Sequence, residues 1–288
     1  MSDNWLVIDC DYLCHRAHWS MRDELSAEDG SATSVVFGFL STVLWMQDRF
    51  DASHVVFCWD VGESLRKKIL PQYKGNRRRD SKNASPEERH EARRQRKALR
   101  RQTHKLRIDI LNDLGYENVL YKPGYEADDW IAATCRSIQY SWPMDDVFII
   151  SADYDLLQCL AHGVNLYSPA TKKVWTLREF VKTYKLGPSQ WLEVKAIAGC
   201  STDNIPGVPG VGEKTAIKYV NGELKGNKVD DIEEAEALIE RNKELVELPF
   251  RDELKRPKLT KTLPDKKSWK RMMKKIGMPS LVKQGPHV

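Results

Sequence analysis

The chain has 288 residues, a length that suggests about two domains. Of these residues 41% are hydrophobic, 30% charged and 9% aromatic, so the chain can bury a core. This composition argues against a disordered or membrane-spanning chain, because no stretch approaches 18 uncharged apolar residues. The first residues lack the basic region of a signal peptide, so we expect a cytoplasmic protein.

The small net charge of +5 hides a strong segregation of charge along the chain. Residues 66–107 carry 17 Lys+Arg against 4 Asp+Glu, residues 255–288 carry 11 against 1, and the rest carries 18 against 36. The two basic segments predict binding to a polyanion, of which nucleic acid is the commonest. Because the carboxylates between them would repel phosphate unless divalent metal lay there, metal-dependent phosphodiester chemistry is the leading hypothesis.

Short apolar runs alternate with amphipathic segments along the first half of the chain. Strands are predicted at 5–9, 54–59 and 146–150, and helices at 34–50 and 128–138. Continuous apolar strands separated by helices indicate an α/β fold with a mostly parallel sheet covered on both faces. Acidic residues follow the carboxyl ends of these strands, where such sheets bind ligands. They are Asp9, Asp60, Asp153 and Asp155.

The six cysteines are scattered through apolar contexts, which favours reduced, buried thiols. Cys10, Cys14 and His18 have helical spacing, and a zinc site there is the less favoured alternative.

A projecting basic helix is predicted after residue 85. Ser85 is a helix N-cap with Pro86 at the first helical position and Glu88 three residues after the cap. Residues 89–107 have almost no apolar stripe, so the helix is expected to project from the core rather than pack in it. Its positive charges lie beside one another and repel until a polyanion binds.

A glycine-rich turn is predicted between helices at 190–198 and 213–220. Gly207, Gly210 and Gly212 give a tight turn, and Lys214 and Thr215 lie in the first turn of the following helix. Backbone amides at such a helix start bind phosphate without reading bases. The pattern indicates a helix-hairpin-helix element that holds the backbone of duplex DNA.

Seven motifs in chain order carry a family resemblance. They are Ile8-Asp9, FGFL at 37–40, Trp59-Asp60, YKGNR at 73–77, GYEADD at 124–129, DYDLLQ at 153–158 and DNIPGVPGVG at 203–212. The chain resembles the flap endonuclease family of 5′-3′ exonucleases, which includes the nuclease portion of bacterial DNA polymerase I and free-standing bacteriophage enzymes. The resemblance implies a PIN-like nuclease domain at 1–185 with a basic helical arch at 62–108. A helix-hairpin-helix subdomain at 186–255 and a basic tail at 256–288 complete the expected organisation.

The resemblance also implies roles for individual residues. The first metal cluster would comprise Asp9, Asp60, Glu126, Asp128, Asp129 and Asp153, and the second Asp155 and Asp203. Lys74 and Arg77 would contact the scissile phosphate, Tyr73 would stack on an unpaired base, and Asp153 would be essential for catalysis. Further DNA contacts are expected from Arg66, Arg93, Arg94, Arg96, Lys97, Gly207, Gly210, Gly212, Lys214 and Thr215. Mg²⁺ is the expected metal, with Mn²⁺ able to substitute and K⁺ implied at the hairpin.

The implied partner is DNA with 5′ ends, flaps or gaps, bound by a monomer, with replication proteins as further candidate partners. Members of the family usually read Gly-Asp where this chain has Gly199-Cys200. Because a thiol is a poor Mg²⁺ ligand, we expect a weak second metal site, or one completed by substrate phosphate. The expected function is a 5′-3′ exonuclease and flap endonuclease. The alternative is a catalytically impaired, structure-specific DNA-binding protein of the same fold.

Overall fold

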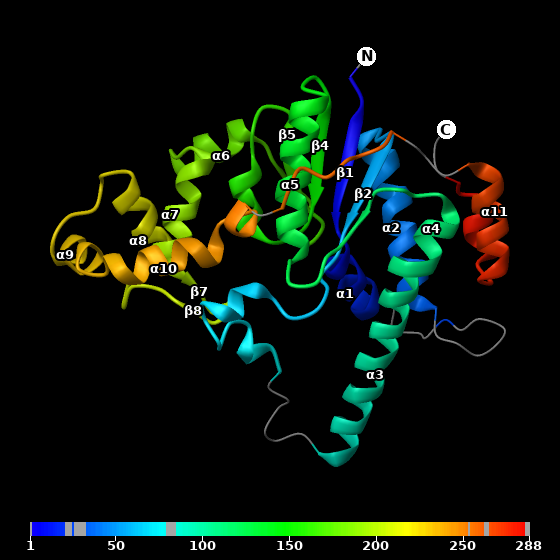
Figure 1. The fold of residues 1–288 in the computed structure, drawn as a ribbon, viewed down its shortest axis with the longest axis horizontal. Coiled ribbons are helices and arrows are strands. Elements are labelled where there is room, and N and C mark those ends of the chain that lie inside the picture. The colour runs from blue at the N-terminus through cyan, green and yellow to red at the C-terminus, as the bar shows by residue number, and fades with distance from the viewer. Residues whose placement is uncertain are drawn as a thin grey trace.

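The computed structural model describes residues 2–20, 25, 33–78, 85–252, 254–261 and 265–285. Figure 1 shows a central sheet with a helical lobe at one end of the long axis and a single long helix, α3, projecting from the body. The strands are β1 Asn4–Asp9, β2 His54–Cys58, β3 Val119–Leu120, β4 Asp146–Ile150, β5 Val164–Ser168 and β6 Lys173–Trp175. Two further two-residue strands, β7 Gly199–Cys200 and β8 Ile205–Pro206, form a separate antiparallel pair.

The large sheet has the strand order β3-β2-β1-β4-β5-β6, and only β6 runs antiparallel to its neighbour. The order reverses between β1 and β4, and the crevice beyond the carboxyl ends at such a point is where open α/β sheets bind ligands. Asp9 ends β1, while Asp60 and Asp153 follow the ends of β2 and β4. The predicted α/β class and the mostly parallel sheet are confirmed.

Both faces of the sheet are buried, as the continuous apolar strands predict. Trp5 and Val7 of β1 belong to a core shared with α5 (Ala127–Ser141) and the helical lobe. Leu6 and Ile8 point the other way, into a core shared with α1 (Cys10–Ser20) and α2 (Ser34–Phe50). Alternation along one strand thus divides the core into two layers. Cys10 and Cys14 are buried in the second layer.

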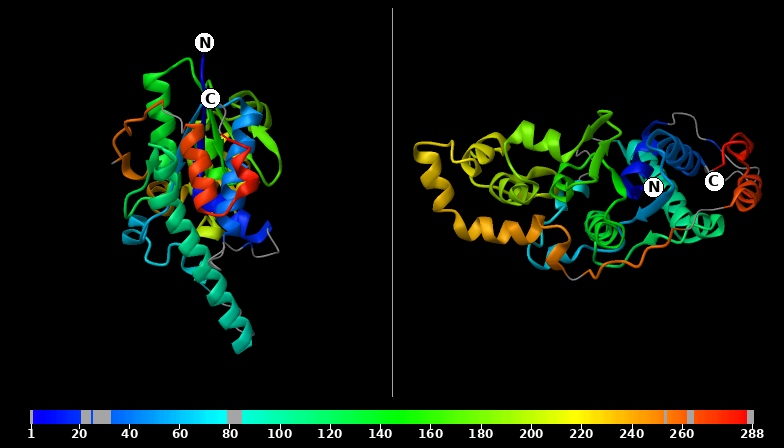
Figure 2. Two further views of the ribbon diagram at one scale, coloured as in Figure 1. Left: turned by 90° about the vertical axis from the view of Figure 1, so that its right-hand side faces the viewer. Right: turned by 90° about the horizontal axis from the view of Figure 1, so that it is seen from above.

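The projecting helix α3 runs Pro86–Lys105 and begins at the predicted capping box. The Ser85 hydroxyl accepts from the Glu88 amide at 3.2 Å, and the Glu88 carboxylate accepts from the Ser85 amide at 2.7 Å. Near the C-terminal end of α3, the Gln102 side-chain oxygen accepts from the Val35 amide at 2.9 Å and so caps the first turn of α2. The helix is therefore anchored at its base while its first turns extend away from the body, as the side view in Figure 2 shows.

After α3 the chain continues through a π-helical turn at Leu106–Ile110 into α4, Leu111–Leu114. The helical lobe contains α6 Leu177–Tyr184, α7 Pro188–Ala198, α8 Glu213–Val220, α9 Asn227–Glu233 and α10 Glu236–Val246. Short 3₁₀ turns occur at Leu65–Lys68, Gly75–Arg78, Tyr154–Cys159, Ser201–Asp203 and Phe250–Asp252. None of the helices in the described ranges combines the length and apolar content needed to cross a bilayer.

The segment predicted as a basic C-terminal tail at 256–288 contains two helices in its described part. The chain returns along the sheet to α11 (Lys266–Lys275) and α12 (Pro279–Val282), at the end of the molecule opposite the helical lobe (Figure 2). Trp269, Met272 and Met273 are buried in the same core layer as α2. These apolar residues recur at helical spacing among the lysines, so the segment packs instead of remaining a free tail.

Candidate active site

Acidic side chains surround a cavity of about 460 Å³ beyond the carboxyl ends of the strands. Four of the expected metal ligands line it: Asp9, Asp60, Asp128 and Asp153. Lys74 reaches the same cavity from just before the 3₁₀ turn Gly75–Arg78, and Thr202 from the 3₁₀ turn Ser201–Asp203. The fold thus brings together residues that are up to 193 positions apart along the chain, Asp9 and Thr202.

Hydrogen bonds hold the carboxylates in place. Asp9 accepts from the Ser151 hydroxyl at 2.8 Å and from the Tyr12 amide at 3.0 Å. Asp60 accepts from the Ala127 amide at 2.6 Å, so it caps the start of α5, the helix that carries Asp128. Because these partners are backbone amides and a buried hydroxyl, the carboxylates are oriented before any ligand binds.

The cavity is electrostatically unfavourable for so many carboxylates. Burial, followed by the neighbouring charge of Asp60, raises the pKa of Asp9 to about 7. Desolvation and the charge of Asp155 raise the pKa of Asp153 to about 6. Burial and the charge of Asp153 also raise the pKa of Asp128. Like charges held together in a low dielectric favour uptake of a cation.

Sequence reasoning missed one acid in this cavity. Asp11, in the first turn of α1, lines the cavity and accepts from the Asp60 amide at 2.8 Å. Burial and the charge of Asp60 raise its pKa to about 7. Its position two residues after Asp9, at the start of a helix that follows a strand, was a signal that pointed to this location.

A second group of acids lies beside the cavity in direct contact with cations. Glu126 and Asp203 both accept from the Tyr73 hydroxyl, at 2.9 and 3.2 Å, and the Lys74 ammonium is 2.9 Å from Glu126. Burial alone would raise the pKa of Glu126, but Lys74 and Arg66 lower it overall. Tyr73 is only 2% exposed, so the expectation that its ring stacks on an unpaired base is wrong. Its hydroxyl instead donates to two acids, Glu126 and Asp203.

Asp155 faces a lysine that sequence reasoning also missed. The Lys195 ammonium of α7 lies 2.8 Å from the Asp155 carboxylate. Cys200 lies near this pair, and its thiol is 3.0 Å from the Thr202 hydroxyl. Burial raises the pKa of the Cys200 thiol, which keeps it protonated. The part of the molecule expected to hold a second metal therefore contains a thiol and a lysine.

Two expected site residues lie in the interior, away from the cavity lining. Arg66 is 2% exposed, and its guanidinium donates to both oxygens of Asp129 at 2.9 and 2.8 Å. It also donates to the Leu245 carbonyl at 2.7 Å, joining α5 to the end of α10. The assignments of Arg66 to DNA contact and of Asp129 to metal binding are corrected here, because each is the buried partner of the other.

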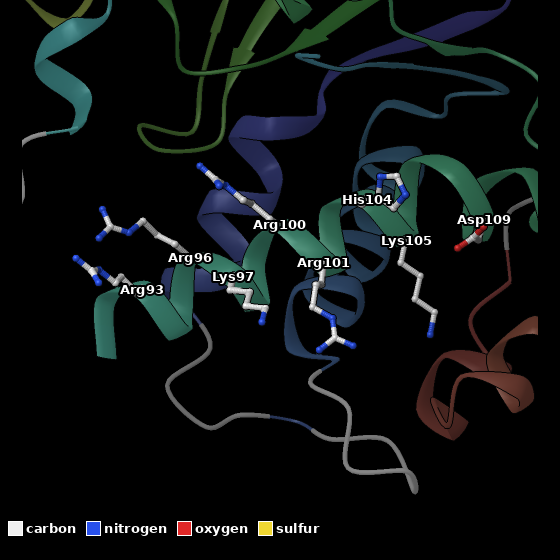
Figure 3. Close-up of a pocket in the computed structure, with 8 residues that line it drawn as sticks. All are labelled: Arg93, Arg96, Lys97, Arg100, Arg101, His104, Lys105 and Asp109. Atoms are coloured by element: carbon white, nitrogen blue, oxygen red, sulfur yellow. The ribbon is translucent and has the colours of Figure 1, made fainter. Parts of the chain in front are cut away.

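The predicted basic face of α3 is open to solvent. Arg93, Arg96 and Lys97 line a surface hollow of about 1110 Å³. Figure 3 shows their side chains projecting from the helix. Arg94 is instead paired with Glu91 at 3.0 Å. Arg77 belongs to the 3₁₀ turn Gly75–Arg78, and its side chain lies outside the described residues.

The glycine-rich hairpin has the backbone that its sequence predicts. Gly210 has φ +71°, a region that disfavours other side chains, and Gly212 is the N-cap of α8. A Cβ atom on Gly207 would lie 2.1 Å from the Ala198 carbonyl oxygen, so the hairpin approaches α7 too closely for any other residue. Lys214 and Thr215 lie in the first turn of α8, with Lys214 exposed.

Comparison with known proteins assigns both parts of the chain. Residues 4–185 match the 5′-3′ exonuclease N-terminal resolvase-like domain, and residues 186–278 match the 5′-3′ exonuclease C-terminal SAM fold. A 5′-3′ exonuclease of Bacillus subtilis is 30% identical over 223 residues, covering 75% of this chain and 69% of that protein. DNA polymerase I of Mycobacterium bovis is 29% identical over 262 residues, covering 84% of this chain but only 27% of the polymerase.

Solved structures agree with this assignment. The bacteriophage T5 5′-exonuclease bound to zinc ions is 25% identical, with a TM-score of 0.70 over 85% of this chain and 90% of that one. Flap endonuclease-1 of Methanococcus jannaschii, at 17% identity and a TM-score of 0.59 over 98% of this chain and 90% of that one, shares the fold. The chain belongs to the 5′-3′ exonuclease family, a family of divalent-metal-dependent nucleases that hydrolyse phosphodiester bonds.

Proposed function

We propose that this protein is a structure-specific 5′ nuclease that uses Mg²⁺ to cleave DNA at 5′ ends and 5′ flaps. The observation that carries the proposal is the cavity lined by Asp9, Asp60, Asp128 and Asp153 at the carboxyl ends of the parallel strands. Of the described residues that line it, Lys74 is the one lysine or arginine. A site so rich in carboxylates needs a cation before it can accept a phosphate.

The donor set fits Mg²⁺, with Mn²⁺ as a substitute. Every acid that lines the cavity offers hard carboxylate oxygens, and no cysteine of the described chain lines it. Within the described ranges, no three His, Cys, Asp or Glu side chains form a preformed metal cage. Mg²⁺ usually binds through one or two carboxylates and keeps several waters, so separate carboxylates around an open cavity can hold it. Divalent ions bound there would supply an activated water and neutralise charge on the phosphate oxygens.

Lys74 is the side chain placed to contact the scissile phosphate. Its ammonium lines the cavity and lies 2.9 Å from Glu126, so an acid beside the cavity orients it. Tyr73 and Asp203 complete the support, because the Tyr73 hydroxyl holds both acids beside the lysine. A cation oriented in this way stabilises negative charge that develops on the phosphate. Arg77 stays a proposed second contact.

Two surfaces bind DNA on either side of the cavity in this proposal. The exposed cations of α3 contact the 5′ single strand, and the hairpin before α8 holds the backbone of the duplex through its amides. A K⁺ ion on the hairpin carbonyls, a monomeric state and contact with replication proteins are the remaining parts of the proposal, and all three rest on the family resemblance.

The second candidate, a DNA-binding protein with impaired catalysis, has one observation in its favour. Asp155 is neutralised by Lys195, and Cys200 occupies the position where an acid is usual in the family. A lysine beside Asp155 competes with a metal ion, and a thiol is a poor Mg²⁺ ligand, so a second metal ion would bind weakly there. The acidic cavity nevertheless keeps all four of its expected carboxylates and also contains Asp11, which favours the nuclease.

A cleavage assay separates the two candidates. Blunt, gapped and 5′-flap DNA of one sequence are incubated with Mg²⁺, Mn²⁺ or EDTA, using wild type, Asp153→Ala and the exposed control Asp230→Ala. We expect cleavage of the flap by wild type and the control with either metal, none with EDTA, and none by Asp153→Ala, which should still bind DNA. Wild type that binds the flap without cutting it supports the second candidate. An Asp153→Ala variant that cuts within a factor of a few of wild type contradicts the assigned site.

A further inference from the structure

The helix α11 presents an exposed basic face that the proposed site does not use. Lys267, Lys270, Arg271 and Lys274 recur at helical spacing and are exposed, opposite the stripe formed by Trp269, Met272 and Met273. Within the described chain none of these four cations has a salt bridge within 4 Å, whereas the neighbouring Lys275 pairs with Asp113 at 3.2 Å. A purely solvated helix would be expected to balance such charges with acids one turn away.

The segment that carries α11 is fixed to the body at several points. The Thr260 amide donates to the Asn118 side chain at 3.0 Å, and the Lys261 ammonium lies 2.8 Å from Asp145. The Trp269 indole is buried and donates to the Leu281 carbonyl at 2.7 Å. The four cations of α11 are therefore held on a docked helix, so little order has to be gained when an anion binds.

The basic face of α11 continues the cationic surface of the arch. In Figure 3, Arg101 and Lys105 of α3 point toward the side of that helix where α11 lies. α3 leads through the π-helical turn into α4, and α11 packs against α4. Lys105 and the α4 residue Asp113 are separated by about 12 Å along the helix axis, at roughly 1.5 Å per residue. A few nucleotides of one strand span that gap.

We propose that the exposed face of α11 binds the phosphate backbone of the single-stranded 5′ segment of the substrate, beyond the arch. The inference rests on the proposed function, because it assumes a substrate with such a segment. The hairpin of the helical lobe, which suits duplex, lies at the opposite end of the long axis from α11 (Figure 1). The strand that continues past the cavity toward α11 is then the 5′ segment. Since Trp269 is buried, α11 offers cations without an aromatic platform, so its contact is independent of sequence.

The test measures DNA binding in EDTA, so it does not depend on cleavage. Two substrates share one duplex and differ in their 5′ flap, about 3 or about 20 nucleotides long, because a short flap carries too few phosphates to reach beyond the arch. The variant Lys270→Ala/Arg271→Ala is compared with Arg178→Ala/Lys182→Ala, which removes two exposed cations from α6 in the helical lobe. A fourfold variant adds Lys267→Ala and Lys274→Ala, and melting temperatures report on folding.

For the long flap, we expect the slope of log K against log salt to fall by about 0.7 for each lost contact, so by about 1.4 in the double variant. The short flap and the α6 control should keep the wild-type slope. An unchanged slope on the long flap shows that α11 is only solvated and overturns the proposal. Equal losses on both flaps, or on a nicked duplex without a flap, show that α11 contacts duplex and overturn it as well. Failure of wild type to cleave any flap would refute the proposed function. The binding measured in EDTA would still test whether α11 contacts the 5′ segment.

Discussion

Replacing Arg66 with methionine tests the conclusion that Arg66 and Asp129 are structural rather than catalytic. The guanidinium forms two hydrogen bonds to Asp129 and one to the Leu245 carbonyl, all between 2.7 and 2.9 Å. In Arg66→Met, Asp129 keeps its bonds from the amides of Phe250 and Glu126, but its charge is buried without a cation. Breaking such a pair costs about 3–5 kcal/mol, a large fraction of the roughly 5–15 kcal/mol that stabilises a typical domain.

Urea unfolding followed by tryptophan fluorescence measures this loss. The control is Lys67→Ala, because Lys67 lies beside Arg66 on the same 3₁₀ turn and pairs with Glu63 at the surface. Removing this exposed pair should cost no more than about 1 kcal/mol. An Arg66→Met variant as stable as the Lys67→Ala control would refute the claim that the buried pair joins α5 to α10.

A matched pair of neighbouring substitutions tests the catalytic side of the same conclusion. Asp128 lines the cavity, whereas Asp129 is 0% exposed and bonded to Arg66. Asp128→Asn should raise the Mg²⁺ concentration needed for half-maximal cleavage, because it removes a charged ligand. Asp129→Asn should lower stability and leave that concentration unchanged. A similar rise in both variants would show that Asp129 also binds metal, contrary to its position.

Three further outcomes are expected. Gly207→Ala should weaken duplex binding, because its Cβ would meet the carbonyl oxygen at the end of α7. Gly212→Ala should be tolerated, because no atom lies within 4 Å of its Cβ. Equal binding losses in a titration with duplex DNA would contradict this role of the hairpin. Cys200→Asp should lower the Mg²⁺ concentration needed for cleavage, because it restores a hard oxygen ligand. Superimposable Mg²⁺ titrations of variant and wild type would mean that position 200 does not face a metal. Asp11→Asn should also raise the Mg²⁺ requirement, since Asp11 lines the cavity beside Asp60; an unchanged requirement would leave Asp11 with only a role in holding the Asp60 backbone.

The sequence by itself determined the features that depend on neighbouring residues. The apolar run before Asp9 predicted a buried strand, and β1 has its Trp5 and Leu6 in opposite core layers. The capping box at Ser85 formed as predicted, because its two hydrogen bonds join residues three positions apart. Gly210 has the positive φ that a tight turn requires. Each of these features follows from backbone geometry within one turn or one strand.

Only the tertiary structure decided which charged residues belong to the site. Asp128 and Asp129 are adjacent and chemically identical, yet successive helical residues point in different directions, so one lines the cavity and the other meets Arg66. Lys195 reaches Asp155 from a helix 40 positions away along the chain, and no local pattern marks such a pair. The role of a charged residue in a folded protein depends on how deeply it is buried and on which charged groups lie next to it. Both depend on contacts between distant segments, which sequence spacing does not fix.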